Sequence, residues 1–161
     1  MIRYPRSPGL GVPLSRPILP LEGPWVEVLR EGDDLLILGL GPQVQAAMEA
    51  ADRLSAEGVR ASVANVRRVH PLDVEVLSDL LVAHPAVLTL EDNVLAGGFG
   101  SSVLELMTER AICRPVQRLG LPDAFVGHGP LALLRRDVGL DVESITETAS
   151  RLIRSSPAVA G

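Results

Sequence analysis

Short apolar runs alternate along this chain with segments of helical periodicity, and this alternation restricts the fold more than any other feature. The run at residues 35–38 (LLIL) precedes a segment in which apolar residues recur every three or four positions from Val44 to Leu54. Further apolar runs, each followed by a predicted helix, lie at residues 60–66, 86–90 and 116–119. Strands that alternate with helices form right-handed βαβ units, so we expect four parallel strands with helices on both faces of the sheet.

One more strand is expected at residues 25–29 (WVEVL), just before the first parallel strand. Only a short turn, Glu31-Gly32-Asp33, separates the two runs, and so short a connection favours an antiparallel hairpin. The predicted fold is therefore α/β with three layers. Its sheet is five-stranded and mostly parallel, with one antiparallel edge strand.

Proline divides the chain into segments. Six prolines fall within residues 1–24, where they remove backbone donors and block helix formation. We interpret residues 1–24 as a proline-rich interdomain linker and residues 25–155 as one domain. Residues 156–161 are expected to be a frayed tail.

The composition excludes several classes of function. All 15 basic residues are arginine, so the chain has no lysine for a Schiff base or a GxxxxGK[ST] phosphate loop. A net charge of -5 and an aromatic fraction of 2% argue against nucleic acid as a partner. No apolar run is long enough for a membrane span. The single cysteine, Cys113, fits the reducing cytoplasm, and we interpret it as a small packed residue.

Two glycine-rich loops, residues 39–41 and 97–100, lie between a predicted strand and a predicted helix. Such loops can hold phosphate at a helix N-terminus, but neither has the third glycine of a dinucleotide-binding motif, so a structural role is favoured. Ser102 and Glu105 have capping-box spacing, which predicts a helix start at Ser102. Glu91 and Asp92 end a buried strand, where carboxylates can cap a helix, contact a subunit or serve a ligand site.

The three histidines, His70, His84 and His128, lack metal-ligand spacing. His84 is expected at a helix end, where the helix dipole favours a cation. His128 lies in a glycine-flanked loop and is the one histidine with a candidate functional role, although a structural or surface role is favoured for all three.

Two arginines three residues apart, Arg3 and Arg6, lie in the proline-stiffened N-terminal segment. A guanidinium group presents a planar fork of donors that matches phosphate or carboxylate. On the residues alone, a surface salt bridge is the more common role of such a pair.

Five segments in order resemble the 1-deoxy-D-xylulose-5-phosphate synthase family. Residues 3–6 (RYPR) are similar to its RYPRG motif, with Ser7 in place of the glycine. Residues 65–73 (NVRRVHPLD) resemble NARFVKPLD, with Arg68 and His70 as departures. The other three segments are residues 90–101 (LEDNVLAGGFGS), 119–129 (LGLPDAFVGHG) and 139–141 (GLD).

The resemblance implies a thiamine-diphosphate enzyme that joins pyruvate, with loss of CO₂, to glyceraldehyde 3-phosphate. This chain would be its C-terminal domain and would serve architecture, dimerisation and acceptor-phosphate binding. Arg6 matches the arginine that contacts the acceptor phosphate, and no other site residue carries over. The GDG…N motif for thiamine diphosphate and Mg²⁺ is absent, as is the cofactor-activating glutamate, so the isolated chain is expected to be inactive.

The resemblance also implies a cytoplasmic homodimer, with the rest of the synthase polypeptide as a partner. We expect the loop at residues 91–101 to face the second subunit, because Val94, Leu95, Ala96 and Phe99 are apolar where loops are normally polar. Packing of Phe99 within the domain is the alternative. Two other functions stay open: the C-terminal domain of another transketolase-like enzyme, such as a dehydrogenase β subunit, and a stand-alone nucleotide-binding or interaction module.

Overall fold

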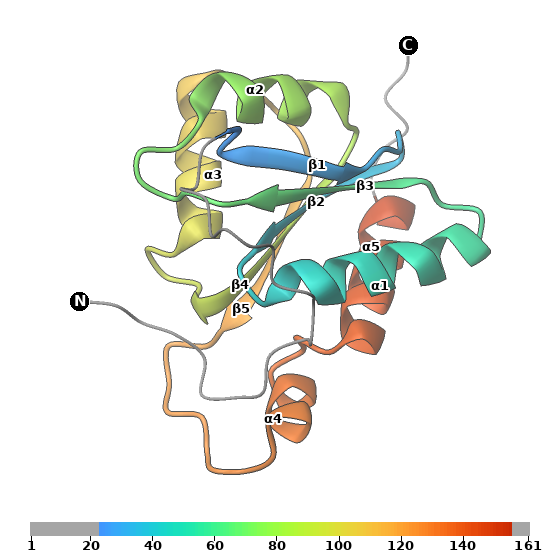
Figure 1. Ribbon diagram of the computed structural model, residues 1–161, viewed down its shortest axis with the longest axis vertical. Coiled ribbons are helices and arrows are strands. Elements are labelled where there is room, and N and C mark those ends of the chain that lie inside the picture. Colours follow the sequence, from blue (N-terminus) through green and yellow to red (C-terminus); the bar gives the residue numbers. More distant parts are fainter. Residues whose placement is uncertain (1–22, 156–161) are drawn as a thin grey trace, which may run out of the picture.

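The computed structural model describes residues 23–155, and five strands form one sheet within them (Figure 1). Every strand pairing is parallel except that of the first strand with the third. The order across the sheet is β1-β3-β2-β4-β5. The predicted mostly parallel sheet with one antiparallel edge strand is confirmed. The strands are β1 (Val26–Arg30), β2 (Leu35–Leu40), β3 (Ala61–Val66), β4 (Val87–Val94) and β5 (Val116–Leu121).

Helices cover both faces of the sheet, as predicted. On one face α1 (Gln43–Ala56) packs against α5 (Val142–Ser155), and on the other α2 (Val74–Ala83) lies beside α3 (Phe99–Glu109). A short helix, α4 (Leu131–Asp137), lies beyond the end of β5. Among residues 23–155, no helix has both the length and the apolar character to cross a membrane. The linker role of residues 1–24 and the fraying of residues 156–161 stay predictions, because residues 1–22 and 156–161 lie outside the described part.

The central strand, β2, supplies both halves of the core. Leu35 and Ile37 pack beneath α1 and α5, whereas Leu36 and Leu38 pack beneath α2 and α3. All four side chains are fully buried. A strand that is buried on both faces reads in the sequence as a continuous apolar run, which is what residues 35–38 show.

The predicted hairpin between the first two strands is wrong. β1 pairs with β3, with Val26 opposite Val66 and Arg30 opposite Val63. Because β2 pairs with β3 on one side and β4 on the other, it has no free edge for β1. Residues 31–34 therefore cross the start of β3, which lies between the two strands that they connect.

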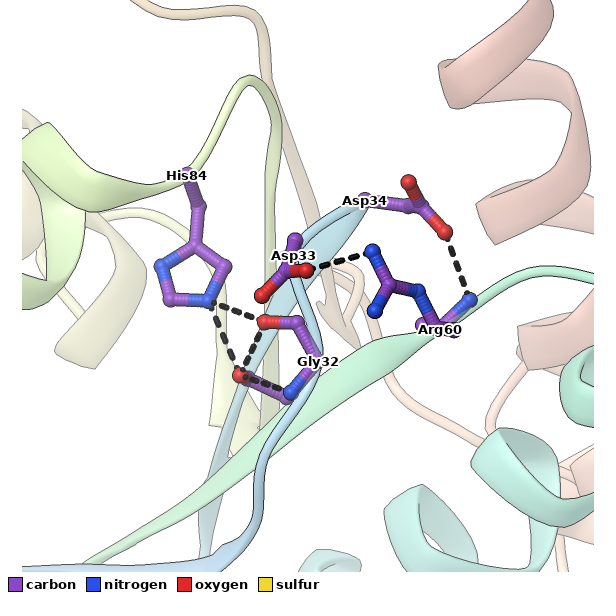
Figure 2. A network of polar contacts seen from close by, with 6 residues as sticks. Gly32, Asp33, Asp34, Arg60 and His84 are labelled. Carbon is purple, nitrogen blue, oxygen red and sulfur yellow. Dashed lines mark hydrogen bonds and ion pairs between the residues drawn. The ribbon is translucent and has the colours of Figure 1, made fainter.

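Polar contacts with β3 and with the end of α2 hold this crossing in place (Figure 2). Ser62 Oγ lies 2.9 Å from the Gly32 nitrogen and 2.7 Å from the Gly32 oxygen. The Nε2 atom of buried His84 lies 2.9 Å from Ser62 Oγ and 3.0 Å from the Gly32 oxygen. Its Nδ1 atom lies 2.7 Å from the Leu80 carbonyl oxygen. His84 thus lies at a helix end, as predicted, and its role is structural.

Asp34 and Arg60 add main-chain bonds at the same place. The Arg60 nitrogen donates to Asp34 Oδ2 at 2.7 Å, and the Asp34 nitrogen donates to the Arg60 oxygen at 2.9 Å. The Arg60 guanidinium also pairs with Asp33, but both side chains are largely exposed, so this ion pair contributes little to stability.

Replacing Gly32 with alanine should destabilise the domain by about 1–3 kcal/mol, the usual cost of overpacking. A Cβ at Gly32 would lie 2.5 Å from the carbonyl carbon and oxygen of Arg60, and these backbone atoms cannot move aside as a flexible side chain can. Gly127→Ala is the matched control, because nothing lies within 4 Å of its Cβ position. Urea unfolding followed by circular dichroism measures both variants; equal stability would contradict the close crossing.

Candidate functional site at the carboxyl edge of the sheet

The four parallel strands end at one edge of the sheet, the edge where open α/β folds bind ligands. β2 and β4 are neighbours, yet α1 follows β2 onto one face and α3 follows β4 onto the other. The carboxyl ends of these two strands therefore form the topological switch point. The two glycine-rich loops of the sequence follow β2 and β4 directly, so both border it.

Glu91 occupies the N-terminus of α3 at this edge. Its side chain is fully buried, and its two oxygens accept hydrogen bonds from the Phe99 nitrogen at 2.8 Å and the Gly100 nitrogen at 2.9 Å. The positive end of the helix dipole favours the carboxylate in this place. The predicted capping box is wrong: α3 begins at Phe99, so Ser102 lies inside the helix, and Glu91 caps it instead.

Glycine lets the loop close on this carboxylate. A Cβ at Gly98 would lie 2.2 Å from Glu91 Oε2, and one at Gly120 would lie 3.0 Å from Glu91 Cγ. The predicted structural role of the glycines at residues 97–100 is therefore supported. An external anion at this helix end would have to displace the buried carboxylate of Glu91.

Arg118 of β5 braces the same loop from the neighbouring strand. Its Nη1 atom donates to the Leu95 oxygen at 3.1 Å and to Ser101 Oγ at 2.9 Å. Ser101 Oγ also donates to the Leu95 oxygen at 2.9 Å. Sequence reasoning missed Arg118, because nothing in its local pattern separates it from a surface arginine.

Gln43, at the start of α1, is another residue that the sequence did not single out. It is fully buried, and neither its amide nitrogen nor its amide oxygen has a hydrogen-bond partner. α1 also begins without a side-chain cap. A buried amide without partners costs free energy, and the domain's own contacts do not explain Gln43.

The structure corrects two further expectations. Phe99, expected to face a second subunit, is 2% exposed and packs in the core beneath α2 and α3, so for this residue the expectation is wrong. Leu95 is only half-buried and Ala96 is exposed, so their contact with a partner stays a prediction. Cys113, interpreted as a packed residue, is exposed.

The remaining histidines belong to no metal-binding cluster of the described residues. His70 and His128 are both exposed, and His128 lies in the segment that connects β5 to α4. Among residues 23–155, no three His, Cys, Asp or Glu side chains come close enough together to hold a metal ion.

Two arginines hold the chain where it enters the domain. The Arg68 guanidinium lies 4.0 Å from the centre of the Trp25 ring, and its Nε atom donates to the Pro71 oxygen at 2.9 Å. Arg67 Nη1 donates to the Pro24 oxygen at 3.4 Å. Arg3 and Arg6 lie outside the described residues, but the segment that contains them leads into this contact.

The sequence profile of the family described as "Transketolase, C-terminal domain" matches residues 25–145. The chain therefore belongs to this family of domains. Its curated relatives include the 1-deoxy-D-xylulose-5-phosphate synthases of Heliobacterium modesticaldum, 42% identical over 151 residues, and Thermomicrobium roseum, 47% identical over 146 residues. The predicted resemblance to this synthase is confirmed. The matches cover 94% and 89% of this chain but only 23% of each relative, so the chain spans about a quarter of their length.

Solved structures share the fold. A split-gene transketolase described as an inactive β4 tetramer is 32% identical, with a TM-score of 0.76 over 82% of this chain and 43% of that one. A transketolase from Pichia stipitis, 18% identical, has a TM-score of 0.61 over 81% of this chain and 18% of that one. The predicted transketolase C-terminal-like arrangement is confirmed.

Changing Glu91 to glutamine should destabilise the domain by about 1–3 kcal/mol, because one backbone N–H would face an amide NH₂ instead of an oxygen. The helix dipole would also lose its buried negative charge. Glu105→Gln is the control, since Glu105 is an exposed residue of the same helix. Urea unfolding compares the two variants, and a Glu91→Gln domain as stable as the control would show that the cap does not matter.

Proposed function

We propose that this chain is the C-terminal domain of a thiamine-diphosphate-dependent synthase that condenses pyruvate with glyceraldehyde 3-phosphate, releases CO₂ and forms 1-deoxy-D-xylulose 5-phosphate. One observation carries the proposal: relatives bearing that name are 40–47% identical across 89–99% of this chain. The match to one synthase of Geobacter sulfurreducens extends over 99% of the chain, and so includes the segment that contains Arg6.

The chemistry of such an enzyme would come from the rest of the polypeptide. Residues 23–155 contain no cluster of side chains that could hold Mg²⁺, and the sequence lacks the GDG…N motif. Thiamine diphosphate supplies the electron sink for decarboxylation when it is bound. This chain's residues would position the acceptor substrate and the neighbouring parts of the enzyme.

Arg6 is the residue that we assign to the acceptor phosphate. A guanidinium group donates two parallel hydrogen bonds to a phosphate, which fixes the orientation of the substrate as well as its position.

We further propose a cytoplasmic homodimer. The exposed free thiol of Cys113 is compatible with a reducing compartment. Of the alternatives, a dehydrogenase β subunit is less well supported than the synthase, since the relatives cited above are synthases. A nucleotide-binding module at the Gly97 loop is disfavoured, because Glu91 already bonds the backbone N–H groups that a phosphate would need.

In the full-length enzyme, Arg6→Ala should raise the KM for glyceraldehyde 3-phosphate roughly ten- to a hundredfold, the cost of one charge-assisted contact. The KM for pyruvate should change much less, because pyruvate carries no phosphate. Arg16→Ala, in the same proline-rich segment, is the control. Steady-state kinetics with each substrate varied in turn measures the effect; equal changes in both KM values would count against a phosphate contact.

The isolated 161-residue chain should neither bind thiamine diphosphate with Mg²⁺ nor form 1-deoxy-D-xylulose 5-phosphate, because it lacks the cofactor motif. Isothermal titration calorimetry with cofactor and Mg²⁺ tests this. Saturable binding in the micromolar range would place a cofactor site within this chain and contradict the division of labour proposed above.

A further inference from the structure

An unbroken run of exposed residues follows β5. All of residues 122–133 (PDAFVGHGPLAL) are exposed, and we call this segment the apolar projection. Phe125 is 109% exposed, and Val126, Leu131 and Leu133 are 37%, 45% and 46% exposed. In Figure 1 the projection and α4 (orange) extend beyond the end of β5, away from the body of the sheet. Exposed apolar side chains that cluster together mark interaction surfaces, whereas singly scattered ones do not.

Hydrogen bonds order the helical end of the projection, which passes into α4. The backbone nitrogens of Leu133 and Leu134 donate to the Pro130 oxygen at 3.0 and 3.1 Å, and the Leu140 nitrogen donates to the Arg135 oxygen at 2.7 Å. None of the residues of α4 is buried. The contrast with Phe99, which is 2% exposed, shows that the domain can bury a phenylalanine when it folds against its own core. Phe125 instead lies outward, in the segment between β5 and this helix.

The size of the projection selects the kind of partner. Two freely diffusing chains need about 800 Å² of buried surface each, from about 20–30 residues a side, to form a stable complex. The twelve residues of the projection fall short of that number. Domains of one polypeptide associate through smaller interfaces, because the linker keeps their effective concentration in the millimolar range. The projection therefore suits a tethered partner better than a free second copy.

The position of the projection agrees with a tethered partner. The family is that of transketolase C-terminal domains, and this chain spans about a quarter of its relatives, so the remainder of those polypeptides precedes this domain. The chain enters the domain at the carboxyl edge of the sheet, where Val26 at the start of β1 pairs with Val66 at the end of β3. The projection follows Leu121 at the end of β5, on that same edge.

We propose that the apolar projection is the surface on which the preceding, cofactor-binding part of the same synthase polypeptide docks, with Phe125 inserted into an apolar pocket of that part. This inference rests on the proposed function, since it needs the larger polypeptide. The projection carries only Asp123 and His128 as polar, ionisable side chains, so the complementary surface is apolar rather than charged. Large aromatic side chains at the centre of an interface usually supply most of its binding energy.

Hydroxyl-radical footprinting tests the proposal directly, because the chain has only two phenylalanines and they differ in exposure. In the 161-residue chain, checked for folding by circular dichroism, Phe125 should be oxidised rapidly and Phe99 slowly. In the full-length polypeptide the oxidation of Phe125 should fall to near that of Phe99. Val82, 55% exposed on α2, is the internal control and should react equally in both proteins.

Other results would overturn the proposal. Equal oxidation of Phe125 in both proteins would mean that nothing docks on the projection. Protection that grows with the concentration of the 161-residue chain would identify a second copy as the occupant. Protection in that chain at every concentration would mean that the chain covers Phe125 itself.

A pair of variants links the footprint to docking. In the full-length polypeptide, the double variant Phe125→Ser with Leu133→Ser should weaken docking by about tenfold or more, as expected for a central aromatic anchor. Calorimetry should then show this domain unfolding in a transition separate from that of the rest of the polypeptide. Val82→Ser with Leu104→Ser, two exposed positions on α2 and α3, should leave a single transition as in the unchanged protein. Identical behaviour of the two double variants would refute the proposal.

Synthase activity, measured on the same preparation, tests the proposed function separately. A full-length protein that protects Phe125 but makes no product would refute the proposed function and leave the docking surface supported.

Discussion

The buried carboxylate of Glu91 organises the edge of the sheet where ligands of α/β domains usually bind. A charge without partners in this position would cost several kcal/mol. Two backbone N–H groups of α3, eight and nine residues further along the chain, provide the partners. To bring them together the loop has to fold back on itself, which places Phe99 in the core and Gly98 against the carboxylate. The Glu91 carboxylate thereby occupies the N-terminus of α3, a position that would otherwise attract a phosphate.

The opposite edge of the sheet is also closed by the chain's own groups. There the crossing from β1 to β2 passes over the start of β3 and is held by Ser62 and by buried His84. Between these two edges, β2 contributes side chains to the cores on both faces. The chain's own groups therefore hold both ends of the parallel strands as well as both faces of the sheet.

The sequence predicts the layers of this fold better than its connections. The strands and helices follow from local apolar patterns, such as the continuous run at residues 35–38. The partner of β1 does not, because a short connection normally makes a hairpin, and the crossing depends on Gly32 lying against the backbone of Arg60, which is distant in sequence. The cap of α3 was missed for a similar reason: the pattern at Ser102 is local, whereas Glu91 acts from the preceding strand. The exposure of Phe125 and the burial of Phe99 likewise depend on tertiary packing, since both residues have glycines nearby in the sequence and their local patterns do not separate them.

The contact between Trp25 and Arg68 ties the start of the described domain to the loop that follows β3. The guanidinium group lies over the indole ring, whose face attracts a cation. A contact of this kind is worth about 0.5–1 kcal/mol at an exposed site, which is enough to bias the direction of a chain segment without locking it. The stack lies where the N-terminal segment joins the sheet, at the same edge as the apolar projection. The point where the described chain enters the sheet and the apolar projection therefore belong to the same edge of one domain.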